Sequence, residues 1–196
     1  MKLKIFILLS ICLFTFYLNA QNTGKGRIGL TYSLNGGCSV LQPNVMGGGN
    51  DDITSANGIG LIYLKPINNW LEWETGLTYT LYKVTTTSSP TPEVYTHNST
   101  ISLLDIPVGV RASFLKYFFA NGGLLLDLDM MSNSPVSAQT GLGLMLGFGI
   151  KYDFNFGGSI FFNPYGKLHS LLPFGLDSQH ERILESGWKF GVTYKL

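Results

Sequence analysis

The sequence predicts an all-β protein: an eight-stranded antiparallel up-and-down transmembrane β-barrel. Three observations support this prediction. From residue 26 onward apolar residues alternate with small or polar ones, short connections alternate with long ones, and charged residues make up 13% of the chain. A period of two places successive side chains on opposite faces of a sheet. A charged fraction well below the ~25% usual in soluble domains suits a chain in contact with lipid.

Length and composition limit the alternatives. The 196 residues fit one domain. Beyond the first twenty residues no apolar run approaches the ~18 residues of a membrane-spanning helix, so any membrane crossing must use strands. The net charge of +1 gives no sign of a nucleic-acid partner. The glycine runs 36–37 and 47–49 lack the lysine and the helix of a phosphate-binding loop, and we expect no cofactor.

Residues 1–20 are predicted to be a cleavable signal peptide. Lys2 and Lys4 form a basic start, a short apolar stretch follows over 5–18, and Ala20 offers a small residue before a cut at Gln21. Residues 21–196 then form the barrel domain. With the signal removed, Cys38 is the remaining cysteine, so we expect no internal disulfide, and we place Cys38 in the first long loop.

The first four expected strands each have one apolar face and one small or polar face. They span residues 26–35, 57–65, 70–83 and 101–113. The first is apolar at every even position from 28 to 34, and the second alternates large apolar residues with glycine. The third sets leucines and aromatic rings against Glu72 and Glu74, which cannot face lipid. The fourth sets aliphatic residues against Asp105 and Arg111.

The last four expected strands span residues 117–129, 141–154, 158–169 and 183–196. Leucines oppose Asp127 in the fifth, and the sixth alternates large apolar residues with glycines and Lys151. In the seventh, Phe161 and Phe162 are adjacent, and Pro164 would lose a ladder hydrogen bond. We therefore expect a β-bulge there. The eighth strand returns to strict alternation.

The connections predict how the barrel is oriented. Short turns are expected over 66–69, 114–116 and 155–157, and long loops over 36–56, 84–99, 130–139 and 171–182. This rhythm is typical of outer-membrane barrels with both termini in the periplasm. Aromatic residues near the strand ends favour the membrane interface and should mark the periplasmic rim: Trp70, Tyr117, Tyr152, Phe154 and Tyr194.

The polar face predicts a charged interior, because eight strands leave room just for side chains. Mutual pairing is expected, since an unpaired charge in a narrow lumen is costly. The expected lumen network comprises Arg27, Glu72, Glu74, Asp105, Arg111, Asp127, Lys151, Glu185 and Lys189. Two alternatives stay open. One is a narrow porin-like transport pore gated by some of these charges. The other is a secreted soluble lipocalin-like binding barrel, which the abundance of glycine opposite the apolar face disfavours.

No catalytic or metal site is predicted. His169 and Ser170 are adjacent, which on a regular strand points their side chains to opposite faces, and His97 with Ser99 falls in a loop. One further cluster could ligate a metal in the last long loop, but such loop clusters are more often solvated: Asp177, His180 and Glu181. The chain is therefore not expected to be an enzyme.

The C-terminus, with Lys189, Gly191, Tyr194 and the final Leu196, resembles the assembly signal of outer-membrane proteins, although the commoner last residue is Phe. Three further segments carry a family resemblance: residues 104–108, residues 163–170 and the Asn-Ala-Gln export junction at 19–21. With the C-terminal signal, they resemble the OmpA/OmpX-like outer-membrane β-barrel domain family, a porin-like group common in Bacteroidetes. The resemblance extends over residues 24–196. The resemblance implies export to the periplasm and insertion into the outer membrane of a Gram-negative cell by the barrel-assembly machinery. We expect a monomer in contact with outer-membrane lipid. Its role is expected to be structural or one of surface interaction, in which the extracellular loops contact an unknown surface ligand.

Overall fold

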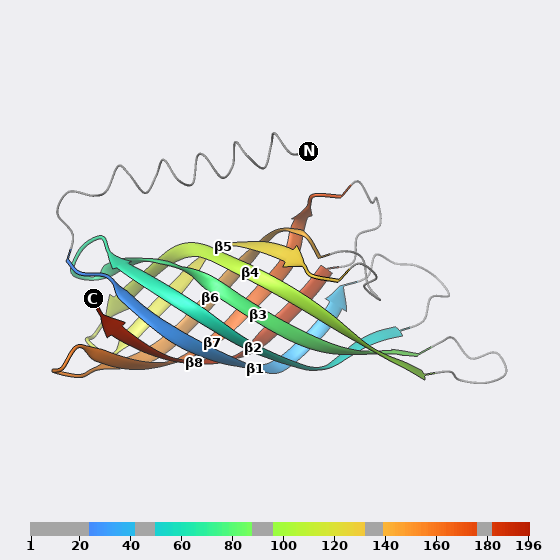
Figure 1. The fold of residues 1–196 in the computed structure, drawn as a ribbon, viewed down its shortest axis with the longest axis horizontal. Coiled ribbons are helices and arrows are strands. Elements are labelled where there is room, and N and C mark those ends of the chain that lie inside the picture. The colour runs from blue at the N-terminus through green and yellow to red at the C-terminus, as the bar shows by residue number, and fades with distance from the viewer. Residues whose placement is uncertain (1–23, 42–49, 88–95, 132–138, 176–181) are drawn as a thin grey trace.

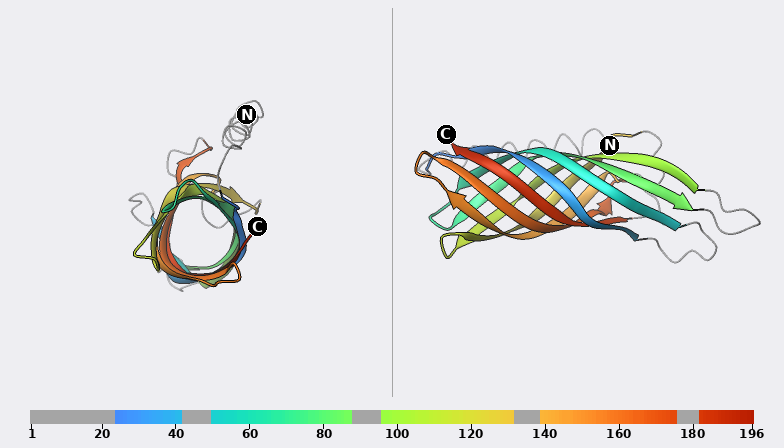
Figure 2. Two further views of the ribbon diagram at one scale, coloured as in Figure 1. Left: turned by 90° about the vertical axis from the view of Figure 1, so that its left-hand side faces the viewer. Right: turned by 90° about the horizontal axis from the view of Figure 1, so that it is seen from below.

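The structure, a computed structural model, is a closed barrel of eight antiparallel strands (Figures 1 and 2). It describes residues 24–41, 50–87, 96–131, 139–175 and 182–196. Each strand pairs with the next, and β1 pairs with β8 to close the sheet. None of the helices that could be assessed in this part of the chain is long and apolar enough to cross a membrane. The strands are β1 (Arg27–Leu41), β2 (Asn50–Pro66), β3 (Leu71–Thr87), β4 (Thr96–Phe114), β5 (Phe118–Asp129), β6 (Gly141–Asp153), β7 (Gly158–Pro173) and β8 (Arg182–Lys195).

The expected number and order of strands are confirmed, but several strands are longer than predicted. β3 runs to Thr87 and β4 begins at Thr96, so much of the expected second loop is strand. Cys38 lies in β1, half-buried, and not in a loop. These segments are rich in Ser, Thr and Gly, which are typical of loops, and the backbone pairing of the neighbouring strands holds them extended.

The two faces of the sheet differ as the alternation predicts. Large apolar side chains point outward and are exposed, for example Leu30 at 67%, Ile59 at 63% and Leu146 at 73%. Charged side chains are buried inside, among them Asp105 of β4, at 0% exposure. This arrangement, with apolar side chains outside and polar side chains inside, is the reverse of that in a water-soluble protein.

The bulge in β7 is not where the sequence suggested. Pairing with β8 runs without a shift from Gly158 to Leu168, with Pro164 opposite Trp188, so the prediction of a bulge near Pro164 was wrong. The register shift lies further on, where β6 residues 142–144 oppose β7 residues 168–172. Ser170 there has a φ of 48°. The adjacent phenylalanines need no bulge, because Phe161 points into the barrel and Phe162 packs outside on Trp188.

The short turns and both ends of the sheet gather at one end of the barrel. Leu196 N donates to the Gly26 carbonyl (2.8 Å), and Lys195 N to that of Gly157 (3.0 Å) in the β6–β7 turn. Three of the rings expected at the periplasmic rim pack on one another here: the Tyr117 and Tyr152 rings are 6.3 Å apart, and those of Tyr152 and Phe154 are 5.0 Å apart. The predicted aromatic rim is confirmed as a feature of this end.

At the other end, strands β2, β3 and β4 continue beyond their neighbours (Figure 1). Pairing of β1 with β2 stops at Leu34 opposite Asn57, whereas β3 and β4 pair up to Thr87 opposite Thr96. The outer face changes character along this extension. Leu81 is still apolar, and the outward positions beyond it are polar: Lys83, Thr85, Asn98 and Thr100.

Candidate functional site: the charged interior

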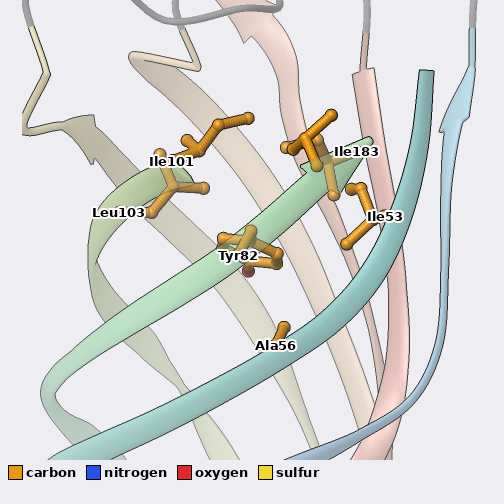
Figure 3. Close-up of a cluster of buried hydrophobic side chains, with 7 residues drawn as sticks. Ile53, Ala56, Tyr82, Ile101, Leu103 and Ile183 are labelled. Atoms are coloured by element: carbon orange, nitrogen blue, oxygen red, sulfur yellow. The ribbon is translucent and has the colours of Figure 1, made fainter. Parts of the chain in front are cut away.

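The loop end of the lumen is filled by apolar side chains, which we call the apolar cap. The cap is drawn in Figure 3, which labels all its members but Val84, and consists of Ile53, Ala56, Tyr82, Val84, Ile101, Leu103 and Ile183. They come from four strands, and the half-buried Cys38 and Val40 pack against them. Several of the cap residues are completely inaccessible to solvent. The cap therefore lies between the polar interior and the loop end of these strands.

Directly beneath the cap lies the acidic cluster, which we define as the carboxylates Asp105, Asp127 and Glu185 with Lys167 and His169. Lys167 Nζ contacts Asp105 Oδ2 at 2.8 Å and lies 3.7 Å from Glu185 Oε2. His169 stands between two acids, with Nδ1 3.1 Å from Asp127 Oδ1 and Nε2 3.1 Å from Glu185 Oε2. All five side chains are at most 3% exposed, so the contacts act in a medium that screens charge poorly.

Glu185 links the cluster to tyrosines of two other strands. The Tyr82 hydroxyl of β3 donates to Glu185 Oε2, and the Tyr165 hydroxyl of β7 donates to Oε1. Tyr82 therefore has two roles, because its ring belongs to the apolar cap and its hydroxyl satisfies a buried carboxylate. A buried carboxylate needs this many donors, because burial without them costs several kcal/mol.

Asp127 is satisfied by the bulge in β7. The backbone N–H of Ser170 donates to Asp127 Oδ2 at 2.9 Å. The side chains of His169 and Ser170 are both fully buried, so the expectation that they point to opposite faces was wrong. The reason is the left-handed backbone at Ser170, which interrupts the alternation.

A second buried pair lies further toward the short-turn end. Arg111 Nε donates to Glu74 Oε2 at 2.8 Å, and both side chains are 1% exposed. The guanidinium carbon lies 4.3 Å from the centre of the Phe119 ring and 4.6 Å from that of Phe161. The Asn121 amide also donates to Glu74 (3.1 Å). The Arg111 guanidinium thus forms an ion pair with Glu74 and cation–π contacts with two phenylalanine rings.

The lumen ends in a partly solvated rim of charges. Arg27 reaches Asp153 at 2.8 Å and lies 3.9 Å from Glu72. Lys151 lies 3.8 Å from Asp153, whose side chain is 41% exposed. These groups face the short-turn end, where the exposed pairs are held weakly.

Glycines make room for the larger interior groups. A Cβ at Gly143 would stand 2.7 Å from Asp127 Oδ2, and one at Gly191 would stand 2.2 Å from the Phe161 ring. Neither position can carry a side chain without displacing a group of the interior. This agrees with the expectation that glycine relieves crowding on the lumen side.

The nine residues expected in the lumen network all occupy inward positions, but eight of them form three separate groups and Lys189 stands apart. Asp105, Asp127 and Glu185 lie in the acidic cluster, Glu74 and Arg111 form the second pair, and Arg27, Glu72 and Lys151 lie at the rim. Lys189 is 5% exposed and stands over the Tyr165 ring, with Nζ 5.3 Å from the ring centre.

Sequence reasoning missed the contribution of β7 and the tyrosines. Lys167 and His169 complete the acidic cluster, and Asn163 donates to Asn121 (3.1 Å). Strict alternation from Phe161 to His169 would have revealed them, because every second residue there is polar or aromatic. The expected loop cluster of Asp177, His180 and Glu181 lies outside the described residues, as does the signal peptide.

The residues of the expected assembly signal divide between the two faces of β8. Lys189 and Gly191 point inward, whereas Tyr194 and Leu196 are exposed on the outside at 56% and 55%. The inward glycine accommodates the Phe161 ring described above. These positions show the two-sided pattern of a barrel's last strand.

Comparison with known proteins supports the fold. No family model matches the chain, and no curated protein matches it significantly. Two similar solved structures are both outer membrane proteins. OprG from Pseudomonas aeruginosa has a TM-score of 0.53 at 13% identity, over 89% of this chain and 97% of that one. AlkL, determined in lipid bilayers, has a TM-score of 0.49 at 14% identity, over 91% and 94%. The chain thus has the closed eight-stranded antiparallel architecture of an outer-membrane barrel.

Proposed function

We propose that the protein is an outer-membrane β-barrel with a closed interior, which acts through the surface it displays at the loop end and not as a pore. The observation that carries this proposal is the inversion of the barrel: apolar side chains cover the outside, while buried, paired charges fill the inside. Such an exterior would be insoluble in water and is stable in lipid.

The apolar outer surface has two clear edges, as expected of a band that spans a membrane. Aromatic rings mark its lower edge at the short turns, and the change from Leu81 to Lys83 marks its upper edge. A strand needs about 9–11 residues to cross a bilayer. β3 and β4 have 17 and 19 residues, so their polar continuation extends beyond the band into water. A lipocalin-like soluble barrel would need the opposite arrangement of faces.

The closed interior favours a structural or surface-interaction role over transport. The apolar cap lies above the acidic cluster, and Arg111 with two phenylalanines lies below it. An ion passing along the axis would have to displace buried groups that already have partners. We therefore propose that the working surface lies on the loop-end strands and loops, where it contacts an unknown surface ligand, and that the protein does no catalysis. The barrel is proposed to be a monomer inserted by the assembly machinery.

A narrow pore is the second candidate, and one observation favours it. Charged side chains occur at three levels of the interior, from Arg27 at the rim to Glu185 beneath the cap. If these pairs exchanged partners, they would form a gated path. Conductance decides between the two candidates.

Cell fractionation and gel mobility test the location. We expect the protein in the outer-membrane fraction, with a folded form that migrates differently from the heat-denatured form on gels. Recovery of the protein as a soluble periplasmic species would overturn the membrane proposal. The OmpA/OmpX-like membership stays a prediction in either case.

Conductance of the purified barrel in a planar bilayer tests the closed interior. We expect no steady openings from the wild-type protein, with a larger porin in the same bilayer as the positive control for incorporation. Steady openings that disappear in Glu74→Gln or Lys189→Met would contradict the proposal and establish the pore.

A further inference from the structure

We propose that the acidic cluster is a binding site for one divalent transition-metal ion, with Asp105, Asp127 and His169 as its ligands. Each of the three offers one ligand atom, and these atoms all lie within 4.8 Å of one another. The three come from different strands, β4, β5 and β7. Each side chain is at most 1% exposed.

An orphaned atom points to a missing ligand. Asp105 Oδ1 is buried without a hydrogen-bond partner, although its sister atom Oδ2 is bound by Lys167. It faces His169, with 3.9 Å between Oδ1 and Nδ1. A buried carboxylate oxygen without a partner is unfavourable, and a cation beside it would remove that cost.

The distances suit a small ion of the zinc type. Zinc binds histidine nitrogen and carboxylate oxygen at about 2.0–2.2 Å in tetrahedral sites, which puts neighbouring ligand atoms about 3.4 Å apart. The two measured distances from His169 Nδ1, 3.9 Å to Asp105 Oδ1 and 3.1 Å to Asp127 Oδ1, lie on either side of that value. A nitrogen and two carboxylate oxygens favour zinc, manganese or iron over calcium, which takes oxygen ligands.

Metal-bound histidines usually donate the N–H of their other ring nitrogen to a nearby acceptor, and His169 has such an acceptor. His169 Nε2 lies 3.1 Å from Glu185 Oε2, so the ring can donate Nε2–H to Glu185 and turn the lone pair of Nδ1 to the ion. Tyr82 and Tyr165 fix the Glu185 carboxylate in turn. Three carboxylates and Lys167 leave a formal charge of −2 when His169 is neutral, which a divalent ion balances.

Metal content of the refolded barrel tests the site. Untagged protein is unfolded in urea with a chelator, refolded into detergent with or without zinc chloride, desalted and analysed for metal. We expect about one zinc per folded chain and a higher unfolding midpoint in the presence of zinc, because a metal that binds the folded state stabilises it. His169→Gln and Asp105→Asn should lose the metal, whereas Asp153→Asn, an acid at the exposed rim, should keep it.

Cobalt gives a readout that does not depend on the variants. The wild-type protein refolded with Co²⁺ should gain visible absorption from the bound ion, and zinc should displace the cobalt. Trace metal and no cobalt spectrum in the folded wild-type barrel would overturn the proposal. Equal metal content in His169→Gln and the wild type would overturn it too. Neither result would affect the proposed membrane location or the closed interior.

Discussion

The guanidinium of Arg111 is enclosed by groups from three other strands: the Glu74 carboxylate of β3 and the rings of Phe119 in β5 and Phe161 in β7. That Arg111 and Glu74 point inward follows from the alternation alone. That they pair could not be predicted, because the relative register of strands and the reach across the lumen depend on how the whole sheet closes.

Breaking this pair should be strongly destabilising. Arg111→Met leaves Glu74 buried without its cation, and we expect a loss of about 3–5 kcal/mol. The measurement is urea unfolding in detergent, followed by tryptophan fluorescence and gel mobility. The double variant Arg111→Met with Glu74→Gln should lose less than the single variant, because no buried charge is then unpaired.

Lys83→Met is the matched control for removal of a cation. Lys83 is exposed on the outer face of the extension, and its loss should change stability by less than about 0.5 kcal/mol. A single Arg111→Met variant as stable as this control would show that the buried pair contributes nothing.

Ser170 shows why part of the site could not be predicted from the sequence. An adjacent His and Ser on a regular strand face opposite ways, and nothing in the residue types announces the left-handed backbone at Ser170. Serine is uncommon in that conformation, whereas a glycine or asparagine there would have signalled the bulge. The conformation is imposed by the tertiary contacts, among them the bond from Ser170 N to Asp127.

Among the elements, the turn between β4 and β5 has the least favourable residues for its geometry. Leu115 and Lys116 have φ values of 48° and 66°. Positive φ places both residues in the left-handed region of backbone conformation, which Gly and Asn adopt at the lowest cost. The position of this turn was predicted from the strand pattern, but its residues give no signal of its type.

Replacing Leu115 by Asn and Lys116 by Gly should therefore stabilise the barrel. We expect a gain of about 1–2 kcal/mol in the free energy of unfolding, since the left-handed conformation costs this much per ordinary residue. The contact of Lys116 with the Tyr117 ring (5.2 Å) is lost and reduces the gain slightly. Leu115→Val should act in the opposite direction, because a β-branched residue fits positive φ poorly. A destabilised Asn-Gly variant would contradict this account of the turn.

At the scale of the whole molecule, the outer surface sets where the barrel sits in a bilayer. The pattern of period two predicted the two faces and the closure of the sheet. It did not predict the length of the strands beyond the apolar band, because Ser, Thr and Asn there are equally typical of loops. Cross-strand pairs such as Lys83 opposite Thr100 hold that segment extended.

A charge placed in the band should cost more than the same charge above it. Leu144 lies on the outer face of β6, between Leu124 of β5 and Leu168 of β7. We expect Leu144→Arg to lose about 2–4 kcal/mol in a lipid bilayer. Thr100→Arg, on the polar extension, should be nearly neutral. Equal effects in refolding experiments with lipid vesicles would show that the band does not contact the hydrocarbon region.

The contacts of Glu185 also bear on how the barrel closes correctly. If β8 slipped by two residues along its neighbours, every side chain would stay on its own face. The alternation of apolar and polar residues therefore does not distinguish this register from the correct one. Gly187 or Ile183 would then stand where Glu185 now receives Tyr82 and Tyr165. Those hydroxyls and His169 are buried, and they would lose their acceptor. The buried Glu185 therefore helps to fix the register of β8, because backbone pairing alone would allow several registers.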